Sequence, residues 1–274
     1  MDKLQQLYPL PTRTLPLKGA YLAHDLRSVA GEGGRPYVYA NFIASLDGRI
    51  AVPREGEMGM TVPAATANER DWRLYQELAA QADLIISSGR YLREWAEGKA
   101  QEILQVDDPR FADLRAWRQE RGLKPQADIA ILSNSLRFPV PEVLTAAGRE
   151  VVVFTSAAAD PAGVREMEAR AGRVVVAGEE TVEGAQLVKA MGALGYRLIY
   201  SAAGPKIMQT LVAGGVLDRL YLTVAHRLLG ARRYATIVEG ARFEPAVGMA
   251  LNQIYLDPAG VEGVEQLFLS YDRV

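Results

Sequence analysis

The 274-residue chain has no cysteine and only two histidines, His24 and His226. The first absence excludes disulfides, thiolate metal sites and cysteine nucleophiles, and the second excludes an all-histidine zinc site. No apolar run approaches the roughly 20 residues that cross a bilayer, and residues 1–16 lack the apolar stretch of a signal peptide. These absences predict a cytoplasmic protein with no metal site and no membrane partner.

An excess of charge of either sign is also missing, since 31 Lys and Arg residues face 33 Asp and Glu residues and the net charge is −2. A chain without a basic excess does not attract a nucleic-acid backbone, so we expect no nucleic-acid partner. Small anionic ligands remain possible partners, because a few well-placed arginines are enough to bind them. Hydrophobic residues make up 49% of the chain and charged residues 23%, which is typical of a globular protein with a substantial core.

The chain divides into an N-terminal extension at residues 1–36, interrupted by Pro9, Pro11 and Pro16, and one domain at residues 37–274. Within the extension, residues 20–29 can pack on the domain as a short amphipathic segment. The domain alternates expected strands with expected helices, at 64–82, 181–194 and 206–213. The strands are expected at 37–44, 83–87, 129–132, 151–155, 174–177, 197–201, 220–225, 248–256 and 266–272. Short apolar strands separated by helices favour a mostly parallel sheet covered on both faces, and the last strands suggest antiparallel additions at one edge.

The sequence lacks the G-x-G-x-x-G fingerprint and the P-loop pattern, so a nucleotide would have to bind at another kind of strand end. The best candidate is residues 197–215, where a strand runs into Ala202-Ala203-Gly204-Pro205 and then a helix. Gly204 lets a ligand approach the backbone, and Pro205 suits the first turn of a helix. The N-terminus of that helix would suit a pyrophosphate. An ordinary strand-to-helix turn has the same pattern.

Polar residues follow three other strands of the predicted sheet. Ser87, Ser88, Gly89 and Arg90 follow one strand, and Ser133, Asn134 and Ser135, with Arg137 nearby, follow another. Both turns are compatible with phosphate binding. In residues 41–51, Asn41 and Ser45 share one face of a strand, and Asp47-Gly48 marks a turn. A strand that ends in an ordinary turn fits this last segment equally well.

In this order, these four segments resemble the reductase domain of riboflavin biosynthesis, a branch of the dihydrofolate reductase superfamily. The most specific match is N-F-I-A-S-L-D-G-R-I-A at 41–51, and the segments at 83–92, 133–139 and 203–230 are similar to later motifs of the family. The resemblance covers residues 37–274. It implies an α/β, dihydrofolate reductase-like fold, with a mostly parallel central sheet flanked by helices and antiparallel C-terminal strands. It also implies a homodimer.

The function implied by the resemblance is an NADPH-dependent reduction, in which the ribosylamino group of 5-amino-6-(5-phosphoribosylamino)uracil becomes a ribitylamino group. The cofactor residues would be Ser87, Gly89, Arg90, Ser133, Ala203, Gly204, Pro205 and Lys206. The catalytic residues would be Asn41 and Asp47. The substrate would contact Asn41, Ser45, Asp47 and Thr61, and its phosphate would need a cation, for which Arg70 and Arg73 are the candidates. The resemblance further implies a cis peptide bond between Ala203 and Gly204.

Three positions depart from the family pattern. Ala202 replaces a glutamate, His226 replaces a proline, and Gly59-Met60-Thr61 stands where many relatives carry a tryptophan motif. These departures leave two other interpretations open, an oxidoreductase of the same superfamily with a different substrate and a non-catalytic nucleotide-binding relative. Dihydrofolate is disfavoured as a substrate, because we find no obvious acidic residue on the first long helix to hold a pteridine.

Overall fold

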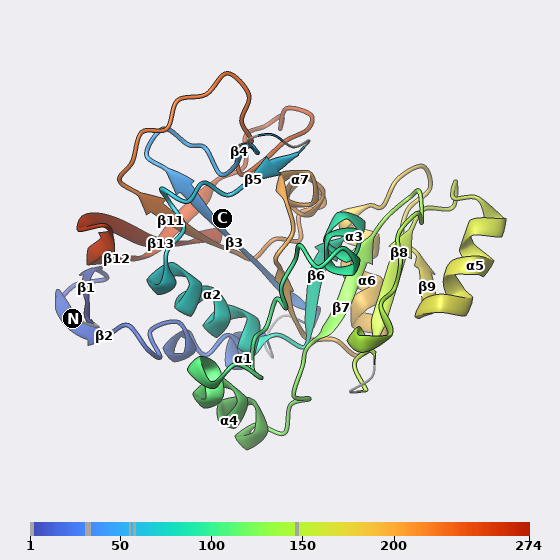
Figure 1. Ribbon diagram of the computed structural model, residues 1–274, viewed down its shortest axis with the longest axis horizontal. Helices are drawn as coiled ribbons and strands as arrows, with labels where there is room; N and C mark the ends of the chain where they lie inside the picture. The colour runs from blue at the N-terminus through green and yellow to red at the C-terminus, as the bar shows by residue number, and fades with distance from the viewer. Residues whose placement is uncertain (1–2, 31–33, 55, 57–58, 146–147) are drawn as a thin grey trace.

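The computed structural model describes residues 3–30, 34–54, 56, 59–145 and 148–274. In this part of the chain, one large sheet has the strand order β2-β1-β12-β13-β11-β3-β10-β6-β7-β8-β9 (Figure 1). The strands from β11 to β9 in this order pair in parallel. Their bounds are β3 Tyr37–Ser45, β6 Leu84–Ser88, β7 Asp128–Leu132, β8 Val151–Thr155, β9 Gly172–Val176, β10 Leu198–Ser201 and β11 Arg219–Ala225. The expected mostly parallel sheet is therefore confirmed.

The remaining strands are antiparallel and come from both ends of the chain. β12 (Met249–Val261) and β13 (Val264–Arg273) form a long hairpin that joins the sheet beside β11. These C-terminal strands are the expected antiparallel additions at one edge of the parallel strands, although they are not the outermost strands of the sheet. β1 (Lys3–Tyr8) pairs with β12, and β2 (Arg13–Pro16) pairs with β1 and becomes the edge. The prolines interrupt the extension as expected, since β1 ends before Pro9 and Pro11 and β2 ends at Pro16. An edge strand tolerates proline because its outer N–H groups need no partner in the sheet.

Helices cover both faces of the sheet, as expected. α2 (Glu69–Gln81), α3 (Gly89–Ala96), α4 (Ala112–Glu120) and α5 (Pro161–Ala171) pack on one face, whereas α6 (Gly184–Ala193) and α7 (Pro205–Ala213) pack on the other. α2 begins five residues later than the expected residue 64, because the Asn68 side chain accepts hydrogen bonds from the backbone N–H groups of Arg70 and Asp71. A two-stranded hairpin of β4 (Val52–Pro53) and β5 (Met60–Thr61) follows β3.

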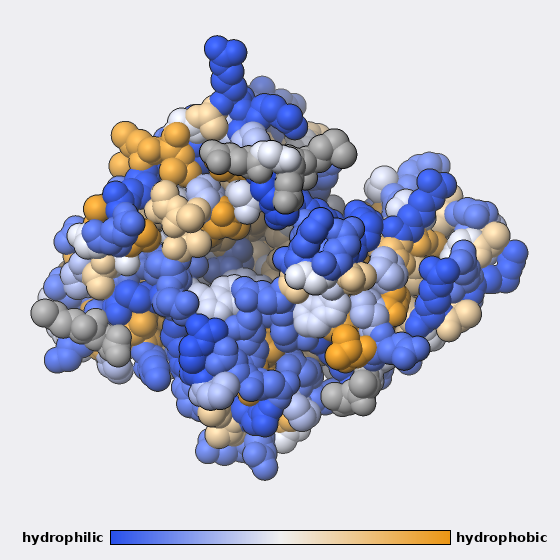
Figure 2. Space-filling view, in the orientation of Figure 1, coloured by the Kyte–Doolittle hydropathy of each residue, from blue (hydrophilic) through white to orange (hydrophobic). Residues whose placement is uncertain are grey.

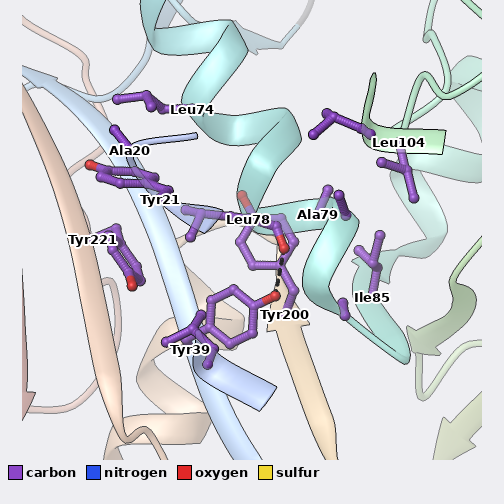
Figure 3. Close-up of a cluster of buried hydrophobic side chains, with 14 of the residues drawn as sticks. Ala20, Tyr21, Tyr39, Leu74, Leu78, Ala79, Ile85, Leu104, Tyr200 and Tyr221 are labelled. Carbon is purple, nitrogen blue, oxygen red and sulfur yellow. Dashed lines mark hydrogen bonds between the residues drawn. The ribbon is translucent and has the colours of Figure 1, made fainter. Parts of the chain in front are cut away.

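A cluster of tyrosines fills the core between α2 and the central strands (Figure 3). Tyr39 and Tyr200 stack with ring centroids 5.0 Å apart, and the Tyr39 hydroxyl donates to the Leu78 carbonyl oxygen at 2.6 Å. Tyr21, from the N-terminal segment that leads to the short helix α1 (Leu26–Val29), packs on Tyr221 at 4.8 Å. The Glu77 carboxylate accepts from the backbone N–H groups of Gly19 and Tyr21. The segment at 20–29 therefore packs on the body of the protein, as the sequence allowed.

Within the described ranges, none of the helices combines the length and the apolar character needed to cross a bilayer. In the same ranges, no group of three or more His, Asp or Glu side chains is arranged to hold a metal ion.

Candidate active site

The main cavity lies at the point of the sheet where the connecting helices change from one face to the other. The helix that follows β3 lies on one face of the sheet, and the helix that follows the neighbouring strand β10 lies on the other. Such a switch point leaves a crevice at the carboxyl ends of the two strands. A cavity of about 1480 Å³ lies there, and a smaller one of about 510 Å³ shares Arg90, Ala203 and Gly204 with it. The hollow is visible in Figure 2 between the positions of α2, α3 and α7 in Figure 1.

The turn from β10 into α7 forms one wall of this cavity. Ala203, Gly204, Pro205 and Lys206 all line it. A Cβ atom at Gly204 would meet no atom within 4 Å, so the space above this glycine is open. Gly204 is the residue before the first turn of α7 and offers no side-chain cap. The arrangement suits an anion bound against the helix N-terminus.

The peptide bond between Ala203 and Gly204 differs from expectation. The cis peptide bonds of the described residues all precede proline, at Pro9, Pro11 and Pro245, so the Ala203–Gly204 bond is trans. A cis bond without proline costs about 3 kcal/mol. Gly204 enters α7 from an extended conformation, with φ −75° and ψ −177°, which makes the turn without that cost.

The expected residues on β6 and β7 separate into two groups. Ser87 and Arg90 line the smaller cavity, and Arg90 also lines the larger one, where it donates to the Met60 carbonyl oxygen and pairs with Glu94. Gly89 and Ser133 are outside both linings. A Cβ at Gly89 would lie 2.8 Å from the Phe138 ring, and the Ser133 hydroxyl accepts from the Leu136 N–H. Packing and a local turn therefore account for these two residues.

Asn41 stands on β3 one residue beyond Ala40, the partner of the last residue of β10. It therefore lies just past the carboxyl end of β10, and it lines the main cavity. The Tyr200 hydroxyl donates to Asn41 Oδ1 at 3.0 Å. Burial raises the pKa of Tyr200 well above its usual value, so this hydroxyl keeps its proton and remains a donor. With Oδ1 occupied, the Asn41 amide is oriented to present its N–H groups to a ligand.

Asp71 on α2 is one of the acidic residues that line the cavity, and it corrects the expectation that the first long helix offers no suitable acid. The side chain lines the cavity, and its Oδ1 accepts from the Thr223 hydroxyl of β11 at 2.6 Å. Removal from bulk water raises the pKa of Asp71 to about 6, and the Thr223 hydrogen bond opposes this rise. The carboxyl group can therefore change its charge near neutral pH.

The expected substrate residues Ser45 and Asp47 do not reach the cavity lining. The Ser45 hydroxyl donates to Asp47, and it accepts from the Arg49 N–H. Asp47 also accepts from the backbone N–H groups of Leu229 and Gly230. The hydrogen bond from Ser45, followed by those from the backbone, lowers the pKa of Asp47 to about 2. These two residues fasten a turn and hold a second loop, as the alternative interpretation of the segment allowed.

Thr61, Arg70 and Arg73 also lie outside the lining. The neighbours of Thr61 on either side contribute to the cavity, whereas among the described residues its own hydroxyl contacts the Val62 carbonyl oxygen, at 3.5 Å. Arg70 pairs with the buried Asp257 at 2.8 Å, and Arg73 is buried between Glu77 and Asp113. Both guanidinium groups are therefore engaged by carboxylates of the fold, contrary to the expected phosphate site.

The RibD C-terminal domain model matches residues 36–261 of the chain. The chain belongs to this family. It is 27% identical over 214 residues to the 2,5-diamino-6-ribosylamino-4(3H)-pyrimidinone 5′-phosphate reductase of Archaeoglobus fulgidus, covering 76% of this chain and 89% of the relative. The reductase of the same name from Methanothermobacter thermautotrophicus is 25% identical over 206 residues, or 75% and 85% of the two chains. A pyrimidine reductase-like protein of Corynebacterium diphtheriae has a similar fold, with a TM-score of 0.65, 19% identity, and coverage of 87% and 92%.

Membership of the RibD C-terminal domain family confirms the resemblance and the expected dihydrofolate reductase-like fold. It also confirms, at the level of the family, the assignment to the reductases of riboflavin biosynthesis. Of the positions at which this family member departs from the common pattern, Ala202 lines both cavities. Gly59 has a φ of +123°, and its Cβ position lies 3.5 Å from an Arg90 side-chain nitrogen.

The sequence analysis missed several polar and aromatic residues of the cavity of this family member. The rings of Trp72 and Tyr75 stack with centroids 4.7 Å apart, and both residues line the cavity. Asp71 lies four residues before Tyr75 and so shares its side of the helix. An acid on the face of an aromatic stripe was the signal available for Asp71. Tyr200 was hidden in an apolar strand, and the loop residues Arg232 and Arg233 belong to no motif.

Proposed function

We propose that this protein takes hydride from NADPH and reduces the ribosylamino group of a phosphorylated aminopyrimidine to a ribitylamino group. One observation carries the proposal, namely that the turn at 203–206, Asn41 and Asp71 line the same cavity. The reaction adds a hydride to C1′ of the sugar and a proton to its ring oxygen, whose bond to C1′ breaks. The curated relatives named above, which are reductases of such a compound, support the choice of substrate class.

The wall at 203–206 fits a dinucleotide. The open space above Gly204 accommodates a pyrophosphate against the N-terminus of α7, and Lys206 adds a positive charge at the same place. Arg90 and Ser87, on the side of the smaller cavity, are the residues we assign to the 2′-phosphate that distinguishes NADPH from NADH. When bound, NADPH supplies the hydride.

The opposite wall would orient the substrate. Tyr200 holds the Asn41 amide so that its N–H groups can donate to a carbonyl or hydroxyl oxygen of the substrate. The ionised Asp71 can accept hydrogen bonds from an exocyclic amino group of the pyrimidine, and burial strengthens such bonds. This role favours the 2,5-diaminopyrimidinone over the aminouracil expected from the sequence, because position 2 of the uracil carries an oxygen in place of the amino group.

NADPH oxidation with purified protein tests the proposal against its rivals. We expect turnover with the diaminopyrimidinone 5′-phosphate, slower turnover with 5-amino-6-(5-phosphoribosylamino)uracil, and a product heavier by two hydrogens in mass spectrometry. Dihydrofolate belongs in the same assay, because Asp71 removes the argument against it. Turnover of dihydrofolate alone would support the superfamily alternative. NADPH binding without turnover of any of the three would refute the proposal in favour of a nucleotide-binding protein.

We also propose that the protein is a cytoplasmic homodimer, as the sequence resemblance implies. Neither property affects the assignment of the site.

A further inference from the structure

The 5′-phosphate of the substrate needs a cation that the fold has not already engaged. Arg70 and Arg73 are paired with carboxylates, as described above. Arg110 lines the cavity, but it pairs with Asp108 at 2.7 Å and with Glu69 at 3.2 Å. Arg90 pairs with Glu94 on the side assigned to the cofactor. These four arginines are therefore poor candidates for a phosphate that arrives with the substrate.

Two arginines of the main cavity remain. Arg232 and Arg233 line it from the connection between β11 and β12, and both side chains are exposed. Within the described ranges, neither guanidinium forms a salt bridge or a hydrogen bond to another group. They share the cavity with Asn41 and Asp71, the residues assigned to the substrate. Adjacent arginines without a carboxylate partner are suited to a dianionic phosphate.

We propose that Arg232 and Arg233 form the binding site for the 5′-phosphate of the substrate, and that Asp47 positions the loop that carries them. The proposal rests on the proposed function, since it assigns the phosphate of that substrate. It also gives a role to Asp47, the acidic residue of the most specific motif in the sequence, which does not itself reach the cavity.

Both ends of the loop at 229–235 are held by the turn that follows β3. On one side, Asp47 accepts from the N–H groups of Leu229 and Gly230. On the other side, Ala235 exchanges backbone hydrogen bonds with residues 50 and 51. The Arg49 guanidinium also lies 4.5 Å from the ring centroid of Tyr234. The two arginines therefore project from a short segment that is fixed on both sides.

The backbone before the arginines has an uncommon conformation. Ala231 has a φ of +95°, and Gly230 before it has a φ of +67°. Glycine adopts such values freely, whereas alanine does so only where surrounding contacts impose them. The clamp by Asp47 acts on the two residues that precede Ala231. Non-glycine residues held in this region are frequent at ligand-binding segments, and here the constraint sets the direction of Arg232.

The test compares wild-type protein with the double variant Arg232→Ala/Arg233→Ala. Ribose 5-phosphate and ribose serve as probes in calorimetry with NADP⁺ present, and steady-state kinetics compare the phosphorylated substrate with its dephosphorylated form. We expect the variant to lose affinity for ribose 5-phosphate and to raise KM for the phosphorylated substrate about ten- to a hundredfold. NADPH affinity and kcat/KM for the dephosphorylated form should change less than about twofold. The double variant Arg165→Ala/Arg242→Ala removes the same charge outside the cavity lining and should behave like wild type.

Asp47→Ala tests the positioning role. It should raise KM for the phosphorylated substrate and leave the kinetics of the dephosphorylated form unchanged. Asp47→Asn keeps an acceptor oxygen, so its KM for the phosphorylated substrate should lie close to that of the wild-type protein. An equal effect of Asp47→Ala on both substrates would mean that Asp47 supports only the fold.

The outcomes separate this assignment from the proposed function. Absence of turnover by the wild-type protein would contradict the proposed function, while the ribose 5-phosphate measurement would still test the arginines. A wild-type protein that turns over, with a double variant that binds ribose 5-phosphate equally well, would overturn the phosphate site alone. Loss of NADPH affinity in the double variant would assign the arginines to the cofactor and would also overturn it.

Discussion

Replacing Asp71 by asparagine should make the protein more stable and less active at neutral pH. Burial raises the pKa of this carboxyl group from 3.8 to about 6, which corresponds to at most about 3 kcal/mol at roughly 1.4 kcal/mol per pH unit. The side chain is open to the cavity, so water reduces this figure, and we expect about 1–2 kcal/mol. The Thr223 hydrogen bond survives, because the asparagine oxygen still accepts it.

The pH dependence of this effect has a definite sign. The unfolded chain releases the Asp71 proton near pH 4 and the folded protein near pH 6, so the folded state binds more protons between these values. Wild-type stability therefore falls as the pH rises from 4 to 6, and the loss persists above pH 6. Asp71→Asn does not titrate. Its advantage in the free energy of unfolding should be absent at pH 4 and complete at pH 7.5.

Urea denaturation at several pH values and steady-state kinetics together test this reasoning. We expect kcat/KM of Asp71→Asn at pH 7.5 to fall about ten- to a hundredfold, the value of one charge-assisted hydrogen bond, and wild-type kcat/KM to fall below pH 6. Glu168→Gln, at an exposed carboxylate on α5 outside the cavity lining, is the control and should change neither quantity in this way. A stability difference that is the same at pH 4 and pH 7.5 would refute the assigned pKa, and an unchanged kcat/KM would refute the role in substrate binding.

Gly204→Val should abolish NADPH binding and leave the melting temperature nearly unchanged, because the φ of −75° at position 204 is accessible to valine and the side chain would enter open space. A fluorescence titration that finds normal NADPH affinity would disprove the placement of the cofactor. Arg90→Ala should weaken NADPH more than NADH, by roughly ten- to a hundredfold in the ratio of dissociation constants, whereas equal weakening of both would remove Arg90 from the 2′-phosphate. Asn41→Ala should lower kcat/KM about tenfold, which is about 1.4 kcal/mol, and Tyr200→Phe should lower it less, with NADPH affinity retained in both variants. A parallel loss of stability and activity in Asn41→Ala would make Asn41 a structural residue. Light scattering should give twice the chain mass of 29.9 kDa, and a single-chain mass would contradict the expected homodimer.

The strands of the sheet were predictable because they are short, apolar and buried on both faces. Val151–Thr155, for example, has the predicted bounds and is entirely buried. The position of the cavity was predictable for a related reason, since carboxyl ends of parallel strands meet at one edge of the sheet. That rule brings Asn41, Arg90 and Gly204 together although they are far apart in the chain.

The polar partners could not be predicted, because they depend on contacts between distant segments. Arg70 meets Asp257 and Asp47 meets Gly230, each pair separated by more than 180 residues. Neither carboxylate has a sequence pattern that names its partner. The expected phosphate site on α2 was wrong for this reason, whereas the spacing of Asp71 and Tyr75 on the same helix was a signal already present in the sequence.

The N-terminal strand pair has a consequence for the solubility of the protein. Without β1, the long strand β12 would expose a row of unpaired backbone N–H and C=O groups, which is a template for aggregation through strand pairing. With β1 and β2 in place, one end of the sheet is a four-residue strand that contains Arg13 and ends at Pro16, and the other end is the five-residue β9. Short, charged or proline-containing edges recruit further strands poorly. A dimer of this protein should therefore form through loops or helices, and not by continuation of the sheet from one molecule into the next.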